Sequence, residues 1–252
     1  TSLTGGGVEC WGYEIFGRLG NGKKRRISQK TPVSVKTVKD AVEVVSGGSH
    51  SCALRSDGSV WCWGNGTTGT LGQGQFAGSS TPVQVSKIDN VVDIAAGVDH
   101  NCAVTSKGFV WCWGHGDDWQ LGNGKSGNKA VPIRVTSVKD AVEVAAGANH
   151  SCVLDKNREV YCWGTNAEYD SGGQLTSGGQ LGSGTFQDSK TPVIVVGPAG
   201  GASLQNIVTI GAGQEHTCAS DTSGEAYCWG NNAKGQLGNN KTDHSNRPVK
   251  VK

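Results

Sequence analysis

One short motif, Cys-Trp-Gly, recurs five times and constrains the fold more than any other feature of the chain. Its copies are separated by 52, 50, 50 and 66 residues and begin at Cys10, Cys62, Cys112, Cys162 and Cys228. In the last four copies a His-x-Cys triplet lies upstream, starting at His50, His100, His150 and His216. A fixed period of this size is typical of stacked repeats or of a propeller. We therefore expect one array of repeats rather than several unrelated domains.

Each repeat contains four short segments with the composition of β-strands. In the second repeat these are residues 42–45, 51–54, 60–63 and 82–85, separated by Gly, Asn, Asp and Ser. The first repeat lacks the first two of these segments. The sequence therefore predicts an all-β fold in a single domain, residues 1–252, with about five repeats: an incomplete unit at 1–35, then units at about 36–85, 86–135, 136–195 and 196–252.

The second and third segments of each repeat are joined tightly. If Cys52 lies opposite Cys62, the hairpin has a three-residue loop, Ser56-Asp57-Gly58, and such loops commonly place glycine in the left-handed conformation. Gly108 and Gly224 occupy the same place in two other repeats. Arg158 takes it in the remaining one, so we expect backbone strain there.

This register also predicts four disulfides. Opposed residues on antiparallel strands have Cβ atoms about 4.5–5.5 Å apart, and a disulfide needs roughly 3.5–4.5 Å, a difference that strand twist can close. The predicted pairs are Cys52–Cys62, Cys102–Cys112, Cys152–Cys162 and Cys218–Cys228. Each bridge would stabilise the fold by roughly 2–3 kcal/mol in the chain-entropy model. Four such bridges imply an oxidising compartment, so we expect a secreted, cell-surface or periplasmic protein.

Zinc binding is the competing interpretation of the same residues. His50, Cys52 and Cys62 would face the same side of their hairpin, and every complete repeat has such a trio. Zinc requires a fourth ligand or an open catalytic position, and no residue supplies one at a repeated place. We therefore interpret the histidines as structural and expect neither a metal nor a cofactor.

Cys10 has no partner within the chain. Superposing Val8-Glu9-Cys10 on Val60-Trp61-Cys62 without a gap places the missing partner one position before Thr1. We therefore expect a cysteine just upstream in the parent chain.

These elements together resemble the repeat of the RCC1-like family (regulator of chromosome condensation). The resemblance covers essentially the whole chain and rests on an ordered series: an Ala-Gly turn, His-x-Cys-Ala-Leu, Asp-Gly-x-Val, Trp-Gly, Gly-Gln-Leu-Gly and Pro-Val-x-Val. It implies a β-propeller of four-stranded blades. The paired cysteines differ from the nuclear exchange-factor type and resemble the extracellular bacterial branch, some of whose relatives inhibit secreted enzymes. Because the family propeller most often has seven blades, further blades or an oligomer would have to cover an exposed end.

The loop after each Trp-Gly keeps a Leu-Gly pair but varies before it, which favours a binding face on a constant frame. Trp119 occupies the position that Gly17, Gly69 and Gly235 have in other loops. We interpret it either as a binding residue or as a cap on its own blade. A glycine-rich insertion near residues 165–184 adds two candidates, with its glycines interpreted as flexible spacer. The candidate ligand-binding residues are Tyr13, Phe16, Asp117, Asp118, Trp119, Tyr169 and Asp170.

An enzyme is not expected. A hydrolytic triad needs one serine, one histidine and one acid set apart from the repeat, and Asp117 and Asp118 would diverge if they lay on a strand. A formal net charge of +2 gives no reason to expect nucleic acid, and no apolar run is long enough to insert into a membrane. We expect a secreted or surface-displayed, adhesin-like module that binds a protein or surface glycan. The alternatives are an inhibitor of a secreted enzyme and a regulator of a small GTPase, which would need reduced cysteines.

Overall fold

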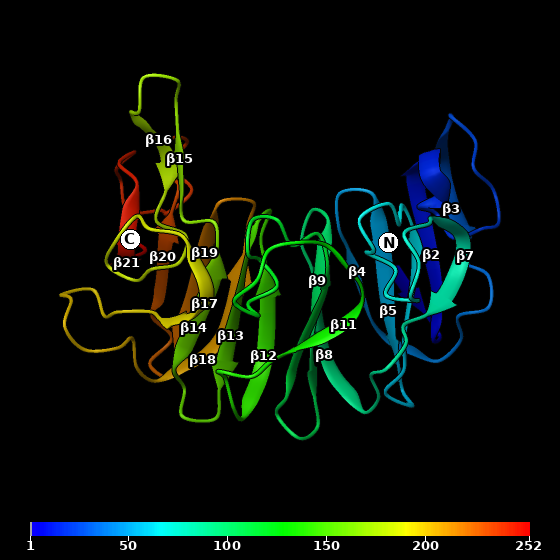
Figure 1. Cartoon of the computed structure of the whole chain (residues 1–252), viewed down its shortest axis with the longest axis horizontal. Coiled ribbons are helices and arrows are strands. Elements are labelled where there is room, and N and C mark those ends of the chain that lie inside the picture. Colours follow the sequence, from blue (N-terminus) through cyan, green and yellow to red (C-terminus); the bar gives the residue numbers. More distant parts are fainter. Residues whose placement is uncertain (1) are drawn as a thin grey trace.

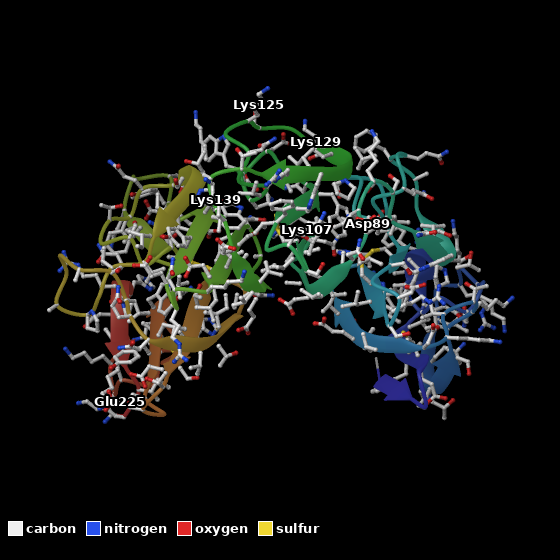
Figure 2. All side chains as sticks on the ribbon, turned by 90° about the horizontal axis from the view of Figure 1, so that it is seen from below. Asp89, Lys107, Lys125, Lys129, Lys139 and Glu225 are labelled. Atoms are coloured by element: carbon white, nitrogen blue, oxygen red, sulfur yellow. A yellow bond between two sulfur atoms is a disulfide. The ribbon has the colours of Figure 1, made fainter. Side chains whose placement is uncertain are left out.

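Five antiparallel sheets stand side by side in an open arc. The computed structural model describes residues 2–252, and Figure 1 shows the sheets following one another in chain order. Figure 2 shows the arc from below, with the first and last sheets at its two ends. The all-β prediction is confirmed, and the sheets fit the blades of a β-propeller; among the described residues no sheet closes onto another.

We number the sheets as blades 1 to 5 in chain order. Blade 1 has three strands, β1 (Ser2–Thr4), β2 (Gly7–Tyr13) and β3 (Ser28–Ser34). Blade 2 contains β4 (Ala41–Ser46), β5 (His50–Arg55), β6 (Val60–Gly64) and β7 (Ser79–Gln84). Blade 3 contains β8 (Val91–Ala96), β9 (His100–Thr105), β10 (Val110–Gly114) and β11 (Lys129–Val135).

The last two blades keep the same order. Blade 4 contains β12 (Ala141–Ala146), β13 (His150–Asp155), β14 (Val160–Gly164) and β17 (Ser189–Ile194). Blade 5 contains β18 (Ile207–Ala212), β19 (His216–Asp221), β20 (Ala226–Gly230) and β21 (Ser245–Lys250). A separate hairpin of β15 (Ala167–Tyr169) and β16 (Leu175–Gly178) is inserted before β17, and a short 3-10 helix, η1 (Ile15–Gly17), follows β2.

The four predicted disulfides are confirmed. In blades 2 to 5 the two cysteines are direct cross-strand partners, as in Cys52 opposite Cys62. The Cα atoms of the pairs are 4.0–4.1 Å apart, close to the short spacing of pairs between which no ladder hydrogen bonds form. The hairpin register that brings the cysteines together is therefore the one that the sequence predicts.

The hairpin turns also agree with the sequence. Gly58, Gly108 and Gly224 have φ of 77°, 72° and 82°, and Arg158 has φ of 64° in the same place. The turn carbonyls of Gly58, Gly108 and Arg158 each accept a backbone N–H from the next blade, at 3.0–3.2 Å. The arginine is thus held in a left-handed conformation because its carbonyl completes the contact between blades.

The expected register of blade 1 is wrong by one position. Ser2 pairs with Glu9, whereas the gapless superposition would pair it with Val8. The cause is a shorter turn at Gly5-Gly6, both with positive φ. The register therefore does not place a residue upstream of Thr1 opposite Cys10, and Thr1 itself lies outside the described residues. Cys10 is a buried free thiol, and burial, the largest cause, raises its pKa to about 11.

A tryptophan fills each junction between neighbouring blades. Its indole is fully buried, and its Nε1–H donates to a backbone carbonyl in the loop of the preceding blade, at 2.8–3.0 Å; the pairs are Trp63 with Arg18, Trp113 with Thr70, Trp163 with Gln120 and Trp229 with Gln180. Two residues after each carbonyl comes a glycine whose Cβ, if present, would lie 2.6–3.0 Å from the indole nitrogen. The Leu-Gly pair therefore recurs because the indole leaves no room for a side chain at the glycine.

Replacing Arg158 with glycine should stabilise the protein by about 1 kcal/mol, because glycine adopts positive φ without the steric cost that an L-residue incurs. The measurement is urea unfolding of the oxidised protein. The matched control is Gly224→Arg, at a turn where a Cβ would meet nothing within 4 Å, and it should destabilise by a similar amount. Equal stabilities of R158G and the parent would contradict this account of the turn.

The disulfide of blade 5 should be reduced first. The disulfides of blades 2 to 4 are buried, whereas Cys218 is partly exposed beside a hollow of about 330 Å³ lined by Gly211, Ala219 and Ala226 among others. A reductant must reach the sulfur atoms, so limited reduction in native buffer followed by alkylation and peptide mapping should label Cys218 and Cys228 ahead of the other six. Uniform labelling of all four pairs would show that burial does not control access.

Candidate functional site

The variable loops all emerge at one edge of the arc. In a four-stranded antiparallel blade the first and third strands run the same way, so the loops that follow them share an edge. This upper face comprises the loops after β2, β6, β10, β14 and β20, the turns after β4, β8, β12 and β18, and the β15–β16 hairpin, which projects beyond the rest (Figure 1). The candidate residues of the sequence analysis lie in these segments.

Tyr13 and Phe16 belong to blade 1 and are 45% and 47% exposed. The guanidinium of Arg18 lies 6.0 Å from the centre of each ring. Between them, the carboxylate of Glu14 is buried and bonded to Arg25 and Asn21, both at 2.6 Å. The bond from Arg25 is the main cause that lowers the pKa of Glu14. This ion pair, in which Glu14 is buried and Arg25 is exposed, holds the loop that carries the two exposed aromatic rings.

Trp119 has a left-handed backbone, with φ of 59°. The equivalent glycines Gly17, Gly69 and Gly235 have φ of 79°, 88° and 78°, so the sequence alignment of this position is confirmed. The ammonium of Lys190, on β17 of the next blade, lies 5.2 Å from the Trp119 ring. Trp119 therefore reaches across the junction of blades 3 and 4 instead of capping its own blade alone.

Asp117 and Asp118 do not lie on a strand, so the divergence that the sequence analysis expects for a strand does not apply. They lie in a turn after β10, and both approach His115: Nε2 is 3.5 Å from Asp117 Oδ2, and Nδ1 is 3.7 Å from Asp118 Oδ2. Residues that alternate on a strand instead share one side of a turn. The two acids and the imidazole form one polar group next to Trp119.

The insertion of blade 4 contains the β15–β16 hairpin, whereas the sequence analysis expects no strands there and interprets its glycines as flexible spacer. Tyr169 is 59% exposed near the hairpin tip. Asp170 accepts the backbone N–H groups of Gly172 and Gln174 with one carboxylate oxygen, at 2.8 and 2.9 Å. Asp170 therefore shapes the tip that presents Tyr169, and only its second oxygen remains for a ligand.

Two acidic residues that the sequence analysis missed complete this part of the face. Burial raises the pKa of Glu168, and the carboxylates of Glu215 and Asp118 raise it further. Glu215 Oε2 accepts hydrogen bonds from Ser177 Oγ and Asn231 Nδ2 at 2.7 and 2.5 Å. The three carboxylates come from blades 3, 4 and 5. Glu215 precedes His216, in a turn that the sequence analysis interprets as structural. The residue before this histidine differs in every repeat, and that variation was the available signal.

The structure thus gathers some candidates and separates others. Asp117, Asp118, Trp119 and the tip with Tyr169 and Asp170 belong to blades 3 and 4, whereas Tyr13 and Phe16 lie in blade 1 at the other end of the arc (Figure 1).

Three of the four repeated histidines, His50, His100 and His150, lie at the blade junctions. Nε2 of His50, His100 and His150 contacts Asn101 Oδ1, Ser151 Oγ and Thr217 Oγ1 of the next blade at 2.8–2.9 Å. Ser151 and Thr217 donate their own protons to the carbonyls of Gln120 and Gln180, so the network assigns the imidazole proton to Nε2. Nδ1 of each ring is buried and has no partner among the described residues.

Burial lowers the pKa of His50, and it lowers those of His100 and His150 to about 3, with neighbouring histidines adding to the effect on the latter two. The cysteines beside them are disulfide-bonded and cannot ligate a metal as thiolates. Within residues 2–252 no group of three His, Cys, Asp or Glu side chains could hold a metal ion. In the same part of the chain no helix is long and apolar enough to span a bilayer.

Comparison with known proteins identifies similar chains. The sequence model of a family described as RCC1-like domain matches residues 2–252. RUG3, a mitochondrial RCC1 domain-containing protein of Arabidopsis thaliana, is 38% identical over 69 residues, which are 27% of this chain and 15% of that protein. Alsin of Rattus norvegicus is 37% identical over 71 residues, again 27% of this chain but 4% of that protein. The chain is thus similar to small parts of these relatives.

Two solved structures share the fold. Human WBSCR16 superposes with a TM-score of 0.82 at 22% identity, covering 99% of this chain and 63% of that one. A chain in the crystal structure of Kap60 bound to yeast RCC1 (Prp20) superposes with a TM-score of 0.73 at 23% identity, covering 98% of this chain and 57% of that one.

Acid should destabilise the junctions through the buried histidines. Below pH 6.5 the unfolded chain protonates its histidines, whereas folded His100 and His150 stay neutral down to about pH 3. Stability should therefore fall as the pH falls through this range, by roughly 1 kcal/mol per pH unit for each of the two. The measurement is the free energy of unfolding in urea at several pH values.

Two carboxyls act in the opposite direction and require a control. Burial, as the largest cause, raises the pKa of Glu43 to about 7 and that of Asp93 to about 6, so both groups add stability as the pH falls. The difference between the parent and His150→Gln isolates one histidine, because both proteins keep the carboxyls. The slope of H150Q below pH 6.5 should be smaller by roughly 1 kcal/mol per pH unit; parallel curves would refute the assignment.

Proposed function

The chain belongs to the RCC1-like domain family, and on that premise we propose that it is a secreted or surface-displayed recognition module. It binds a protein partner through the upper face, in an adhesin-like role and without catalysis of its own.

Trp119 carries the proposal. A tryptophan in the left-handed conformation costs on the order of 1–2 kcal/mol where its counterparts in other blades are glycine. Strain of this kind persists where the surrounding structure enforces it, and it concentrates at functional sites. The Trp119 side chain is only partly buried, and tryptophan is enriched among the residues that contribute most to binding at protein interfaces. A strained backbone that carries a partly accessible tryptophan fits recognition better than it fits packing.

The neighbouring charges indicate the kind of partner. Three neighbouring carboxylates, those of Glu168, Asp118 and Glu215, make further negative charge on this part of the face unfavourable. A partner surface with lysine or arginine around an apolar centre is therefore complementary to it. Tyr169 on the projecting tip extends the same surface. The solved complex that contains yeast RCC1 and Kap60 supports the idea that the fold can engage proteins.

The disulfides support an extracellular setting, because buried cross-strand disulfides in three successive blades form and persist in oxidising compartments. A regulator of a small GTPase would act in a reducing compartment and would lose these bridges. An inhibitor of a secreted enzyme would use the same face but would bind one soluble enzyme at saturation.

Substitution of Trp119 by glycine tests the proposal. The oxidised protein, its W119G and Tyr169→Ser variants and the control Lys107→Ser, in an exposed turn between β9 and β10 at the opposite edge, are immobilised. Each is exposed to the extracellular and cell-surface proteins of the source organism and to a glycan array. We expect a protein partner that K107S retains and that W119G and Y169S each lose at least tenfold.

The stability of W119G separates binding from folding. Because glycine removes the backbone strain, W119G should be at least as stable as the parent in thermal unfolding, so its loss of binding cannot come from unfolding. A partner that W119G and Y169S retain in full and K107S loses would place recognition on the other edge. Binding that is seen only on the glycan array would indicate a glycan ligand instead of a protein partner. Binding of a single soluble enzyme would favour the alternative function, inhibition of a secreted enzyme.

A further inference from the structure

At the lower edge of blade 2, one side chain fills the space between the linker before β4 and the β5–β6 turn. Arg55 Nε donates to the carbonyl of Lys39 at 3.2 Å and to Asp40 at 3.1 Å, and its Nη2 donates to Asp40 at 3.0 Å. Its Nη1 lies 3.3 Å from Asp57, and the guanidinium lies 6.0 Å from the ring centre of Trp61. Blade 2 thus encloses a flat, charged group of its own at this place.

Blade 3 has the same backbone here but a shorter side chain. The N–H of Thr105 donates to the carbonyl four residues on, as that of Arg55 does, and the N–H of the next residue donates to Asn90 in blade 3 and to Asp40 in blade 2. Thr105 therefore occupies the position of Arg55, and Asn90 that of Asp40. Thr105 Oγ1 accepts the N–H of Phe109 at 3.3 Å, so it is directed at its own turn. A hollow of about 210 Å³ lies between the linker and this turn.

The hollow combines aromatic surface with unpaired polar groups. Phe109 and Trp111 both line it. In blade 2 the indole N–H of Trp61 donates to Ser59 Oγ at 3.2 Å, but Phe109 has the position of Ser59 in blade 3 and offers no acceptor. Within residues 2–252 neither the Trp111 Nε1–H nor the side-chain amide of Asn90 has a hydrogen-bond partner. Apolar walls with a few polar groups that converge on them are typical of small-ligand sites.

The two acids that hold the arginine in blade 2 are absent from this place in blade 3. Asn90 has the position of Asp40, and Lys107 has the position of Asp57. A second guanidinium in the blade 3 hollow would therefore lose both ion pairs and face a lysine. The hollow has the shape of the arginine site but not its charge.

The charge around the hollow is positive. Lys87 and Lys107 line it together with one acid, Asp89, and Figure 2, which views the arc from below, shows Asp89 and Lys107 beside each other on this edge. The guanidinium of Arg134 lies 3.7 Å from the ring centre of Phe109 and adds a further positive charge next to the lining. A ligand with one negative charge and a ring-shaped body is therefore complementary to the hollow.

We propose that this hollow binds a sugar that carries a carboxylate, a uronate or a sialate residue of a glycan. The sugar ring lies against Trp111, and its carboxylate faces the lysines. Its hydroxyls pair with the amide of Asn90 and the carboxylate of Asp89. A sugar is favoured over an apolar carboxylate because the amide and the acid would otherwise lose water without gaining a partner. The hollow is at the edge opposite the upper face, so the inference does not depend on the function proposed for that face.

Variants that copy blade 2 test the proposal. The double substitution Thr105→Arg and Asn90→Asp fills the hollow as Arg55 fills its counterpart. Lys87→Thr keeps the hollow but removes a charge, and Thr37, at the same place in blade 2, has φ of 64° against 61° for Lys87. Arg55→Thr is the matched control, because it opens the corresponding place in blade 2, where two acids disfavour an anion.

The measurement is a ¹H–¹⁵N NMR titration of the oxidised protein with the methyl glycosides of glucuronic acid and of sialic acid. Either sugar should shift the indole resonance of Trp111 among the eight indoles. Trp111→Tyr assigns that resonance, since Tyr161 and Tyr227 occupy its position in blades 4 and 5. R55T should bind as the parent does, whereas T105R/N90D and K87T should each bind roughly tenfold more weakly or worse, as expected for the loss of a charged hydrogen bond.

Two further probes separate the sugar carboxylate from its parts. Methyl glucoside has the ring without the charge, and N-acetylphenylalanine has a ring and a carboxylate without the hydroxyls, so both should bind at least tenfold more weakly. The acid that binds more tightly identifies the source as a uronate or a sialate, and binding of either supports the proposal. In addition, Lys107→Ser should weaken the sugar while it keeps the protein partner of the upper face, so the two proposals fail separately.

Four results would overturn the proposal. They are no binding of either acid, equal binding of methyl glucoside, tighter binding of N-acetylphenylalanine, which would indicate the carboxyl terminus of a peptide, and full binding by T105R/N90D. Circular dichroism and thermal unfolding establish that each variant is folded before its affinity is compared.

Discussion

The indole-to-carbonyl bond at the blade junctions is the interaction on which the rest of the structure depends. Each fully buried tryptophan places an N–H against a loop carbonyl of the preceding blade and excludes any side chain from the glycine two residues on. A buried indole left without an acceptor would lose a hydrogen bond at a cost of about 1–3 kcal/mol. This requirement fixes the distance between blades and explains why the Leu-Gly pair recurs while the residues before it vary.

The disulfides and histidines reinforce that arrangement in different ways. The cross-strand bridges constrain the register within a blade, so the tryptophan that follows the second cysteine always points to the same side. The histidines act between blades, through Nε2 and a hydroxyl or amide of the next blade, and burial holds their pKa low. Bridges within blades resist acid, whereas the histidine contacts between blades do not.

A frame held by these repeated contacts can carry loop residues that take no part in them. The loop of blade 3 holds Trp119 in a conformation that other blades give to glycine, and blade 4 adds a hairpin whose tip is shaped by Asp170. In the proposed function, recognition uses surfaces that the repeated contacts between blades do not occupy.

The sequence by itself determined the repeat, the strands, the four disulfides and the left-handed turns, because these depend on residues close together in the chain and on the twofold alternation of strands. Arg158 and Trp119 could be placed in glycine positions for the same reason. Tertiary structure alone decided that Asp117 and Asp118 converge on His115, that the insertion forms a hairpin, that blade 1 shifts by one residue, and that Glu168 and Glu215 join Asp118. These features depend on turn geometry and on contacts between blades, which residue spacing does not specify.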